Sequence, residues 1–190
     1  MPARNNAARF DVVARSLHWL IAALIVVQYV LISYAHAAEE ARKTHPLAAL
    51  EQLAWLARHK SVGLTIFALA IVRLVWRLFS SPPAWPSTMP RWQVRFARTS
   101  HYAFYALLFA LPLSGWLMSS AGNHPVSWFN LFQLPDLVAP SKPLEHVLKE
   151  FHEVAFNTLF ALAIVHVAAA LKHHFIDRDD VLKRMLPWSG

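Results

Sequence analysis

The chain has 190 residues, of which 56% are hydrophobic and 15% are charged, a composition typical of a small integral membrane protein rather than a soluble domain. It contains no cysteine, which excludes disulfides, thiolate zinc sites and iron–sulfur clusters. A net charge of +7 suits nucleic acid or a membrane surface, and the positions of the basic residues decide between them.

Four apolar segments are long enough to cross the hydrocarbon core of a bilayer, which takes about 20 helical residues. In chain order they occupy residues 17–36, 59–79, 100–120 and 147–172. The proline-rich segment 80–90 predicts a non-helical connection, and the longer, irregular segment 122–143 has room for a short interfacial helix. The sequence therefore predicts a single domain over residues 1–190, an all-α integral membrane four-helix bundle.

The first apolar segment has an alternative interpretation as a signal peptide. Arginines precede it and the motif YAHAAEE follows it, which together resemble a cleavable signal with its cleavage site. Its apolar run is longer than the core of a typical signal peptide, and cleavage would remove His18. We therefore expect this segment to be retained as the first span.

Basic residues are unevenly distributed between the two ends of the predicted spans. Four spans place both termini on one side, and the positive-inside rule assigns the more basic side to the cytoplasm. The side with the termini holds twelve basic residues: Arg4, Arg9, Arg15, Arg73, Arg77, Arg91, Arg95, Arg98, Lys172, Arg178, Lys183 and Arg184. The other side holds six: Arg42, Lys43, Arg58, Lys60, Lys142 and Lys149. We expect a multi-pass membrane protein with both termini cytoplasmic. This bias explains the net charge without nucleic acid.

Two histidines stand at opposite ends of the last span, His152 near its start and His166 near its end. An α-helix turns about 100° and rises about 1.5 Å per residue, so the fourteen residues between them make nearly four turns and rise about 21 Å. The two imidazoles thus share one face at two depths. His59 begins the second span at the depth of His152, and His18 begins the first span at the depth of His166. Depth alone predicts the pairs His18/His166 and His59/His152.

Each predicted pair offers two imidazoles with no carboxylate or thiolate as a further ligand. A structural zinc ion takes four protein ligands, whereas a haem brings four nitrogens of its own and needs only axial ligands. The pattern therefore favours two b-type haems, whose iron would be bound by His18, His59, His152 and His166. A histidine at the end of a membrane helix is also an ordinary interfacial residue, and this alternative applies to each of the four taken singly.

Other residues near the predicted pairs suit a haem site. Gly63 lies one turn after His59, where a missing side chain is expected to admit the macrocycle. Arg15, Arg58 and Lys60 stand next to the predicted ligands and are candidate partners of haem propionates.

Three more histidines lie at the end of the bundle that carries the termini: His101, His173 and His174. Imidazole exchanges protons near neutral pH, so these are candidate contacts for a partner that takes up protons together with electrons. Each equally suits a propionate or the membrane interface. No residue is assigned as catalytic.

Motifs along nearly the whole chain resemble the bacterial cytochrome b561 family, whose members are four-helix di-haem proteins of the inner membrane. They are RSLHWL at 15–20, HKSVG at 59–63, HYAFYALLFALPLSG at 101–115, FHE at 151–153, VHVAAALKHHF at 165–175 and DDVLKRMLP at 179–187. The resemblance implies the same four axial ligands. It extends to superoxide:ubiquinone oxidoreductases of this family, which implies superoxide as electron donor at the periplasmic face and ubiquinone as acceptor. With a quinone as acceptor, His101, His173 and His174 are candidate quinone contacts.

The charge on the periplasmic side qualifies the superoxide hypothesis. An anionic substrate is drawn to positive charge, but the six basic residues on this side face seven acidic ones: Glu39, Glu40, Glu51, Asp136, Glu145, Glu150 and Glu153. Only a local cluster of Arg58, Lys60, Lys142 and Lys149 would attract superoxide.

Two other functions remain open from the sequence. The first is a non-catalytic electron carrier that relays electrons between quinol and a partner redox protein, or that works as a homodimer. The second is a small transporter or metal-binding membrane protein. No Asp or Glu lies in the middle of a span, where proton-coupled transport commonly places one, which argues against the transporter.

Overall fold

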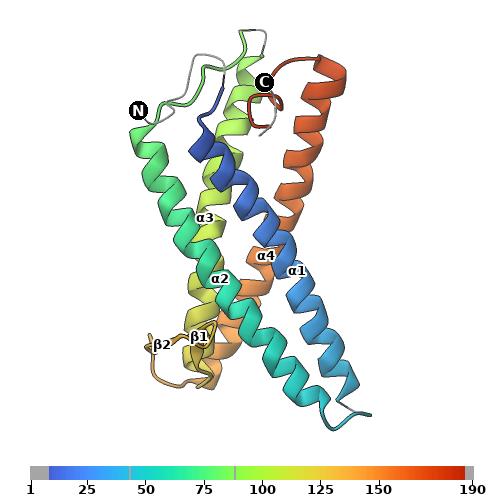
Figure 1. Cartoon of the computed structure of the whole chain (residues 1–190), viewed down its shortest axis with the longest axis vertical. Coiled ribbons are helices and arrows are strands. Elements are labelled where there is room, and N and C mark those ends of the chain that lie inside the picture. Colours follow the sequence, from blue (N-terminus) through green and yellow to red (C-terminus); the bar gives the residue numbers. More distant parts are fainter. Residues whose placement is uncertain (1–8, 43, 88, 187–190) are drawn as a thin grey trace.

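The computed structural model describes residues 9–42, 44–87 and 89–186, so Arg4 and Lys43 of the charge count lie outside the described residues. Four long helices, each apolar enough to cross a membrane, form the body of the molecule (Figure 1). They are α1 (Val12–Ala41), α2 (Ala48–Phe79), α3 (Arg91–Ala121) and α4 (Lys142–Lys172). The expected all-α four-helix membrane fold is confirmed, and three of the helices extend well beyond the expected spans.

Local sequence signals fix where these helices begin. Asp11 caps α1 by accepting a 2.8 Å hydrogen bond from the Ala14 N–H, and Ser141 caps α4 with Pro143 in its first turn. Pro90 precedes α3 and its fixed φ suits a helix start. α4 continues into a π-helical turn, η1 (His173–Asp177), which ends where Arg178 takes a left-handed conformation.

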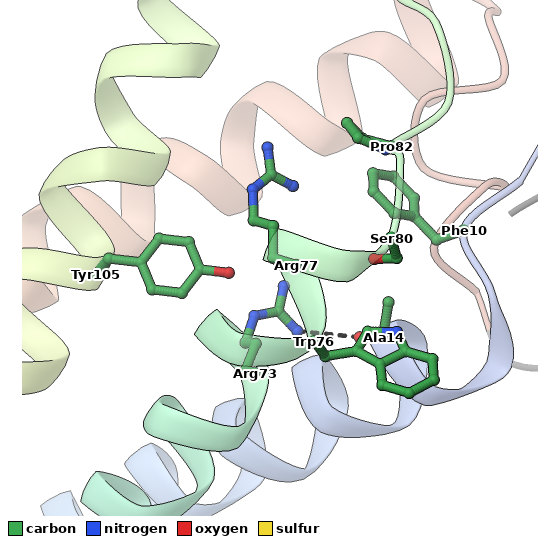
Figure 2. A pocket seen from close by; sticks show the side chains of 8 residues that line it. All are labelled: Phe10, Ala14, Arg73, Trp76, Arg77, Ser80, Pro82 and Tyr105. Atoms are coloured by element: carbon green, nitrogen blue, oxygen red, sulfur yellow. Dashed lines mark hydrogen bonds between the residues drawn. The ribbon is translucent and has the colours of Figure 1, made fainter. Parts of the chain in front are cut away.

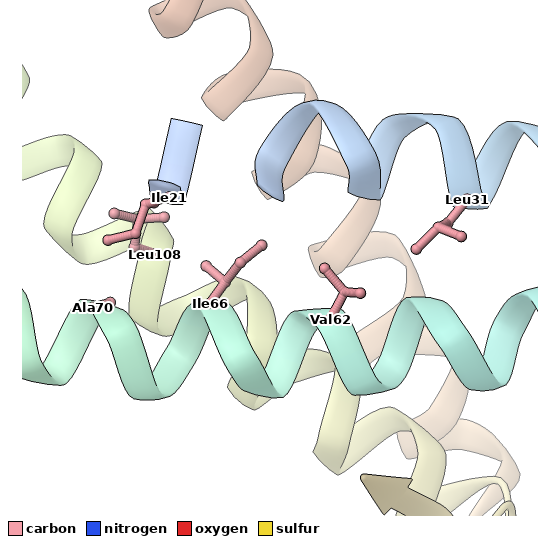
Figure 3. Close-up of a cluster of buried hydrophobic side chains, with 6 residues drawn as sticks. All are labelled: Ile21, Leu31, Val62, Ile66, Ala70 and Leu108. Atoms are coloured by element: carbon pink, nitrogen blue, oxygen red, sulfur yellow. The ribbon is translucent and has the colours of Figure 1, made fainter. Parts of the chain in front are cut away.

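The helices pair in sequence order, α1 with α2 and α3 with α4, and the core lies where α1, α2 and α3 meet. This core consists of Ile21, Leu31, Val62, Ile66, Ala70 and Leu108 (Figure 3). By contrast, no described Cα of α4 lies within 8 Å of a Cα of α1 or α2. α4 therefore faces α1 and α2 across a wider spacing than a packed helix pair, whose axes are about 8–10 Å apart.

A short hairpin replaces the interfacial helix expected between α3 and α4. Strands β1 (Val126–Trp128) and β2 (Phe132–Leu134) pair antiparallel, with Trp128 opposite Phe132. Phe129 and Asn130 in the loop have positive φ, which a helix does not tolerate. Side-chain bonds to α2 hold the hairpin: the Trp128 indole donates to Thr65 Oγ1 at 3.0 Å, and Phe129 N–H donates to Ser61 Oγ at 2.9 Å. These tertiary bonds, which no local pattern signals, override the expected helix.

The two described chain ends lie at the same end of the bundle (Figure 1). The Arg15 guanidinium donates to the Leu186 carbonyl and the Trp19 indole to the Met185 carbonyl, both at 2.8 Å. Arg184 reaches the Ala84 carbonyl in the connection between α2 and α3 at 2.6 Å. We call this the inner end and the opposite one, with the hairpin, the outer end.

Candidate functional site

The outer pair consists of His59 on α2 and His152 on α4. Their ring centroids are 6.5 Å apart and the ring planes are inclined by 68°. Both side chains are partly buried. His59 Nδ1 is buried and has no hydrogen-bond partner in the described part of the chain, which leaves a polar atom available to a bound group.

The inner pair consists of His18 on α1 and His166 on α4. Their ring centroids are 6.2 Å apart and the planes are inclined by 60°. Phe104 of α3 packs edge-on against His166 with centroids 5.2 Å apart, which restricts the orientation of that imidazole. The structure thus brings together both pairs that the depth argument predicts.

The spacing of both pairs fits an iron ion held between two imidazoles. A metal–imidazole bond of about 2.0 Å on each side, added to the ring radii, places two centroids about 6 Å apart. The measured separations of 6.2 and 6.5 Å agree with this value. The backbone of α4 is also more widely spaced from α1 and α2 than in a packed helix pair, as a flat macrocycle between these helices requires. Four histidines, without acidic ligands, match the donor set of two bis-imidazole haems.

Ser114 on α3 orients His152. Its hydroxyl lies 2.9 Å from the Leu111 carbonyl and 2.9 Å from His152 Nδ1. Since the hydroxyl has one proton and the carbonyl only accepts, Ser114 donates to Leu111 and accepts from the Nδ1–H of His152. The proton on Nδ1 leaves the lone pair on Nε2, which is the tautomer that binds a metal through Nε2. Gly115 allows the close approach, because a Cβ there would lie 3.3 Å from His152 Cε1.

We expect Ser114→Ala to weaken haem binding at the outer pair by roughly 10–100-fold, the usual effect of losing a hydrogen bond that orients a metal ligand. The measurement is haem retention of the purified protein during competition with apomyoglobin. Ser119→Ala, another buried serine of α3, is the control and should retain haem like the wild type. Equal retention in the two variants would show that Ser114 does not position the ligand.

His101 is a second imidazole beside His166 that the depth argument missed as a ligand candidate. The two ring centroids are 5.9 Å apart, slightly closer than His18 and His166. His101 stands near the inner end of α3, at the depth of His18, so the same depth reasoning would have found it. The geometry therefore places two candidate partners around His166.

Two arginines near the inner pair were also missed. Arg73 and Arg77 lie one turn apart on α2 and line a small pocket together with Tyr105 of α3 (Figure 2). Arg73 lies close enough to His18, His101 and His166 to interact electrostatically with each. From the sequence, both arginines were assigned only to the more basic side of the membrane.

The three cations expected at the propionates each have a partner within the chain. Arg15 donates to the Leu186 carbonyl. Arg58 lies over the Trp55 ring, 4.6 Å from its centroid, and Lys60 donates to the Pro125 carbonyl at 3.2 Å. A propionate role for them stays a prediction.

His173 is held by acidic side chains at the inner end. Its Nδ1 lies 2.6 Å from Asp179 and 3.2 Å from Asp177, and Lys172 pairs with the same Asp177 at 2.6 Å. This group offers three metal-ligating side chains, but the ammonium of Lys172 offsets the charge of Asp177, one of its two carboxylates. His174 Nδ1 is buried without a partner in the described part of the chain, and its ring packs on Phe175. Quinone contact by His173 or His174 stays a prediction.

Gly63 serves helix packing in this structure. A Cβ at this position would lie 3.0 Å from Nε2 of Gln28 on α1, so the missing side chain accommodates Gln28. The expectation that Gly63 makes space for a macrocycle therefore finds no support in its surroundings, where the nearest group is an α1 side chain.

Four apolar helices with two facing histidine pairs at two depths define a membrane protein of the b-type cytochrome class. Residues 9–188 match the family described as prokaryotic cytochrome b561. The chain belongs to this family, and it is therefore a haem b-binding, multi-pass electron-transfer protein of the bacterial inner membrane.

Several relatives align over almost the full chain. Cytochrome b561 homolog 2 of Escherichia coli (strain K12) is 33% identical, with 96% of this chain and 93% of the relative covered. Cytochrome b561 homolog 1 of the same organism is also 33% identical, with coverage of 94% and 97%. A protein of Yersinia pestis named probable superoxide oxidase CybB is 28% identical, with coverage of 90% and 92%.

Proposed function

We propose that the protein is a di-haem cytochrome that carries electrons across the inner membrane to or from quinone, with axial pairs His59/His152 and His18/His166. One observation carries this proposal: α4 presents two imidazoles on one face, and each meets a second imidazole at the spacing of a shared iron. Their separation along the helix, about 21 Å, supports one redox centre near each membrane surface.

Each haem, when bound, supplies a one-electron redox centre. The two imidazoles of each pair would hold the haem from both sides, and the site would then favour electron transfer over ligand binding at iron. The chain contributes the tautomer of His152 through Ser114 and the orientation of His166 through Phe104. Axial ligation and burial are the means by which a protein sets haem potential.

We further propose that superoxide is the electron donor at the outer end and ubiquinone the acceptor. Two superoxide anions each lose one electron and leave as O₂, while ubiquinone takes both electrons and two protons to form ubiquinol. The similarity to a protein named probable superoxide oxidase supports this choice. Histidines at the inner end, such as His101, would exchange the protons.

A coupled assay tests the superoxide proposal. Detergent-purified protein is given an enzymatic source of superoxide and a soluble ubiquinone, and ubiquinol is measured. We expect formation that superoxide dismutase abolishes and that His59→Ala reduces to background. Haems that are reduced by ubiquinol but never by superoxide would instead indicate an electron carrier.

The carrier function has an observation in its favour. Lys142 pairs with Glu145 at 2.8 Å and Lys149 lies 3.9 Å from Glu153, so carboxylates offset two of the four cations expected to attract superoxide. Lys60 and Arg58 are directed to Pro125 and Trp55. The described outer surface thus lacks the cluster of converging cations that would attract superoxide. Purification with a bound redox partner would favour the carrier.

We propose that the inner end faces the cytoplasm, because it carries the larger share of basic residues. The absence of native cysteine makes labelling direct. In intact cells we expect a membrane-impermeant maleimide to label Leu131→Cys in the hairpin and to spare Ser87→Cys between α2 and α3 until the cells are lysed. The reverse labelling would contradict this orientation.

A further inference from the structure

Within the described residues, two guanidinium groups near the inner pair have no carboxylate partner. Arg73 donates to the Ala14 carbonyl at 3.0 Å and faces Tyr105. For Arg77, the described chain provides no hydrogen bond or ion pair, and its neighbour in the pocket is another arginine (Figure 2). Asp11, the residue after Phe10 of the pocket lining, accepts from the Ala14 N–H and from the Trp76 indole.

This arrangement is unfavourable without an anion. Charged side chains in membrane-spanning helices are costly and normally pair with an opposite charge. Like charges spaced i, i+4 on a helix also repel each other. Arg73 and Arg77 combine both conditions, and their guanidinium groups lie side by side near the tip of Tyr105 (Figure 2). A bound anionic group would stabilise these two guanidinium groups.

The chemistry of the three side chains selects a carboxylate. A planar guanidinium donates two parallel hydrogen bonds to a carboxylate, and a phenol hydroxyl adds a third donor. The site borders the inner histidines, since Arg73 interacts with His18, His101 and His166, and Arg77 with His101. A carboxylate that belongs to a group held between these histidines would therefore lie within reach.

We propose that Arg73, Arg77 and Tyr105 form a carboxylate-binding site for a propionate of the inner haem. This inference rests on the proposed di-haem function. The two arginines stabilise the extra negative charge of the reduced state, and so raise the potential of the inner haem relative to a site without them.

A redox titration of the purified holoprotein tests the site. Its inner haem is identified as the one missing from His18→Ala. We expect Arg77→Gln to shift the reduction equilibrium of the inner haem at least tenfold toward the oxidised form, about 59 mV for one electron. Arg77→Lys, which keeps the charge, should retain most of the potential. Arg95→Gln makes the same change of charge at an exposed position of α3 and should leave the potentials of both haems unchanged.

Two further variants keep the test decisive if Arg77→Gln fails to fold. Arg73→Gln should produce the larger shift, because Arg73 interacts electrostatically with both histidines of the inner pair, whereas Arg77 interacts with His101. Tyr105→Phe should produce a smaller shift in the same direction. Inner-haem shifts no larger than that of Arg95→Gln across this set would overturn the site. Haem content of the wild type is measured first: absence of the inner haem there would contradict the proposed function, whereas two haems with unmoved potentials contradict only the carboxylate site.

A lipid phosphate is the other source of an anion at this depth. The titrations are therefore done in dodecyl maltoside after lipid removal and repeated with phosphatidylglycerol. A propionate partner gives the same Arg77→Gln shift in both conditions. A shift that appears only when phosphatidylglycerol is present would assign the site to lipid and overturn the proposal.

Discussion

Replacing His152 with alanine is expected to reduce the haem content of the purified protein from two per chain to one. Its imidazole is the α4 member of the outer pair, and no other imidazole ring in the described part of the chain packs against the ring of His59. A haem with one axial ligand left is held weakly and changes to a high-spin spectrum. Haem quantification per chain, together with the reduced spectrum, measures the effect.

His146→Ala is the matched control for this variant. His146 lies on the same helix, about two turns before His152, and its side chain is 73% exposed. It should retain both haems. Two haems in His152→Ala, with unaltered low-spin bands, would remove His152 from the ligand set.

The inner haem provides the second large effect, because His166 has two candidate partners. We expect His18→Ala to lose the inner haem and His101→Ala to keep it. His18 is on α1, none of whose described Cα atoms is within 8 Å of a Cα on α4, as an interposed haem requires. His101 is on α3, which packs directly on α4.

The two variants give opposite results under the two assignments. Loss of the inner haem in His101→Ala, with retention in His18→Ala, would make His101 the ligand at 5.9 Å and would leave His18 as a neighbour. Low-temperature electron paramagnetic resonance of each variant shows whether the remaining signals belong to bis-imidazole iron.

The helices and the histidine pairs were predictable from sequence because both depend on short-range regularities. Apolar length identifies the spans, and helical rise and rotation give the relative depth of His152 and His166. Once alternate helices run in opposite directions, the depths of His18 and His59 follow. The structure places each of these imidazoles beside the expected partner.

The supporting residues were not predictable because they depend on which helix faces meet. Ser114 and His152 are 38 residues apart, and only the packing of α3 on α4 brings them to 2.9 Å. The hairpin depends on Ser61 and Thr65 of α2, more than 60 residues earlier in the chain. In the sequence, Arg73 and Arg77 look like ordinary basic residues at the end of a membrane helix. Only their position beside Tyr105 in the folded structure distinguishes them.

Haem quantification of the detergent-purified wild-type protein, with oxidised and dithionite-reduced absorption spectra, is the most direct test of the central claim. Two b-type haems per chain with sharp low-spin bands are predicted, since each histidine pair fills both axial positions of one iron. One haem per chain, or high-spin bands in the wild type, would contradict the assignment of His18/His166 and His59/His152 as two complete axial pairs.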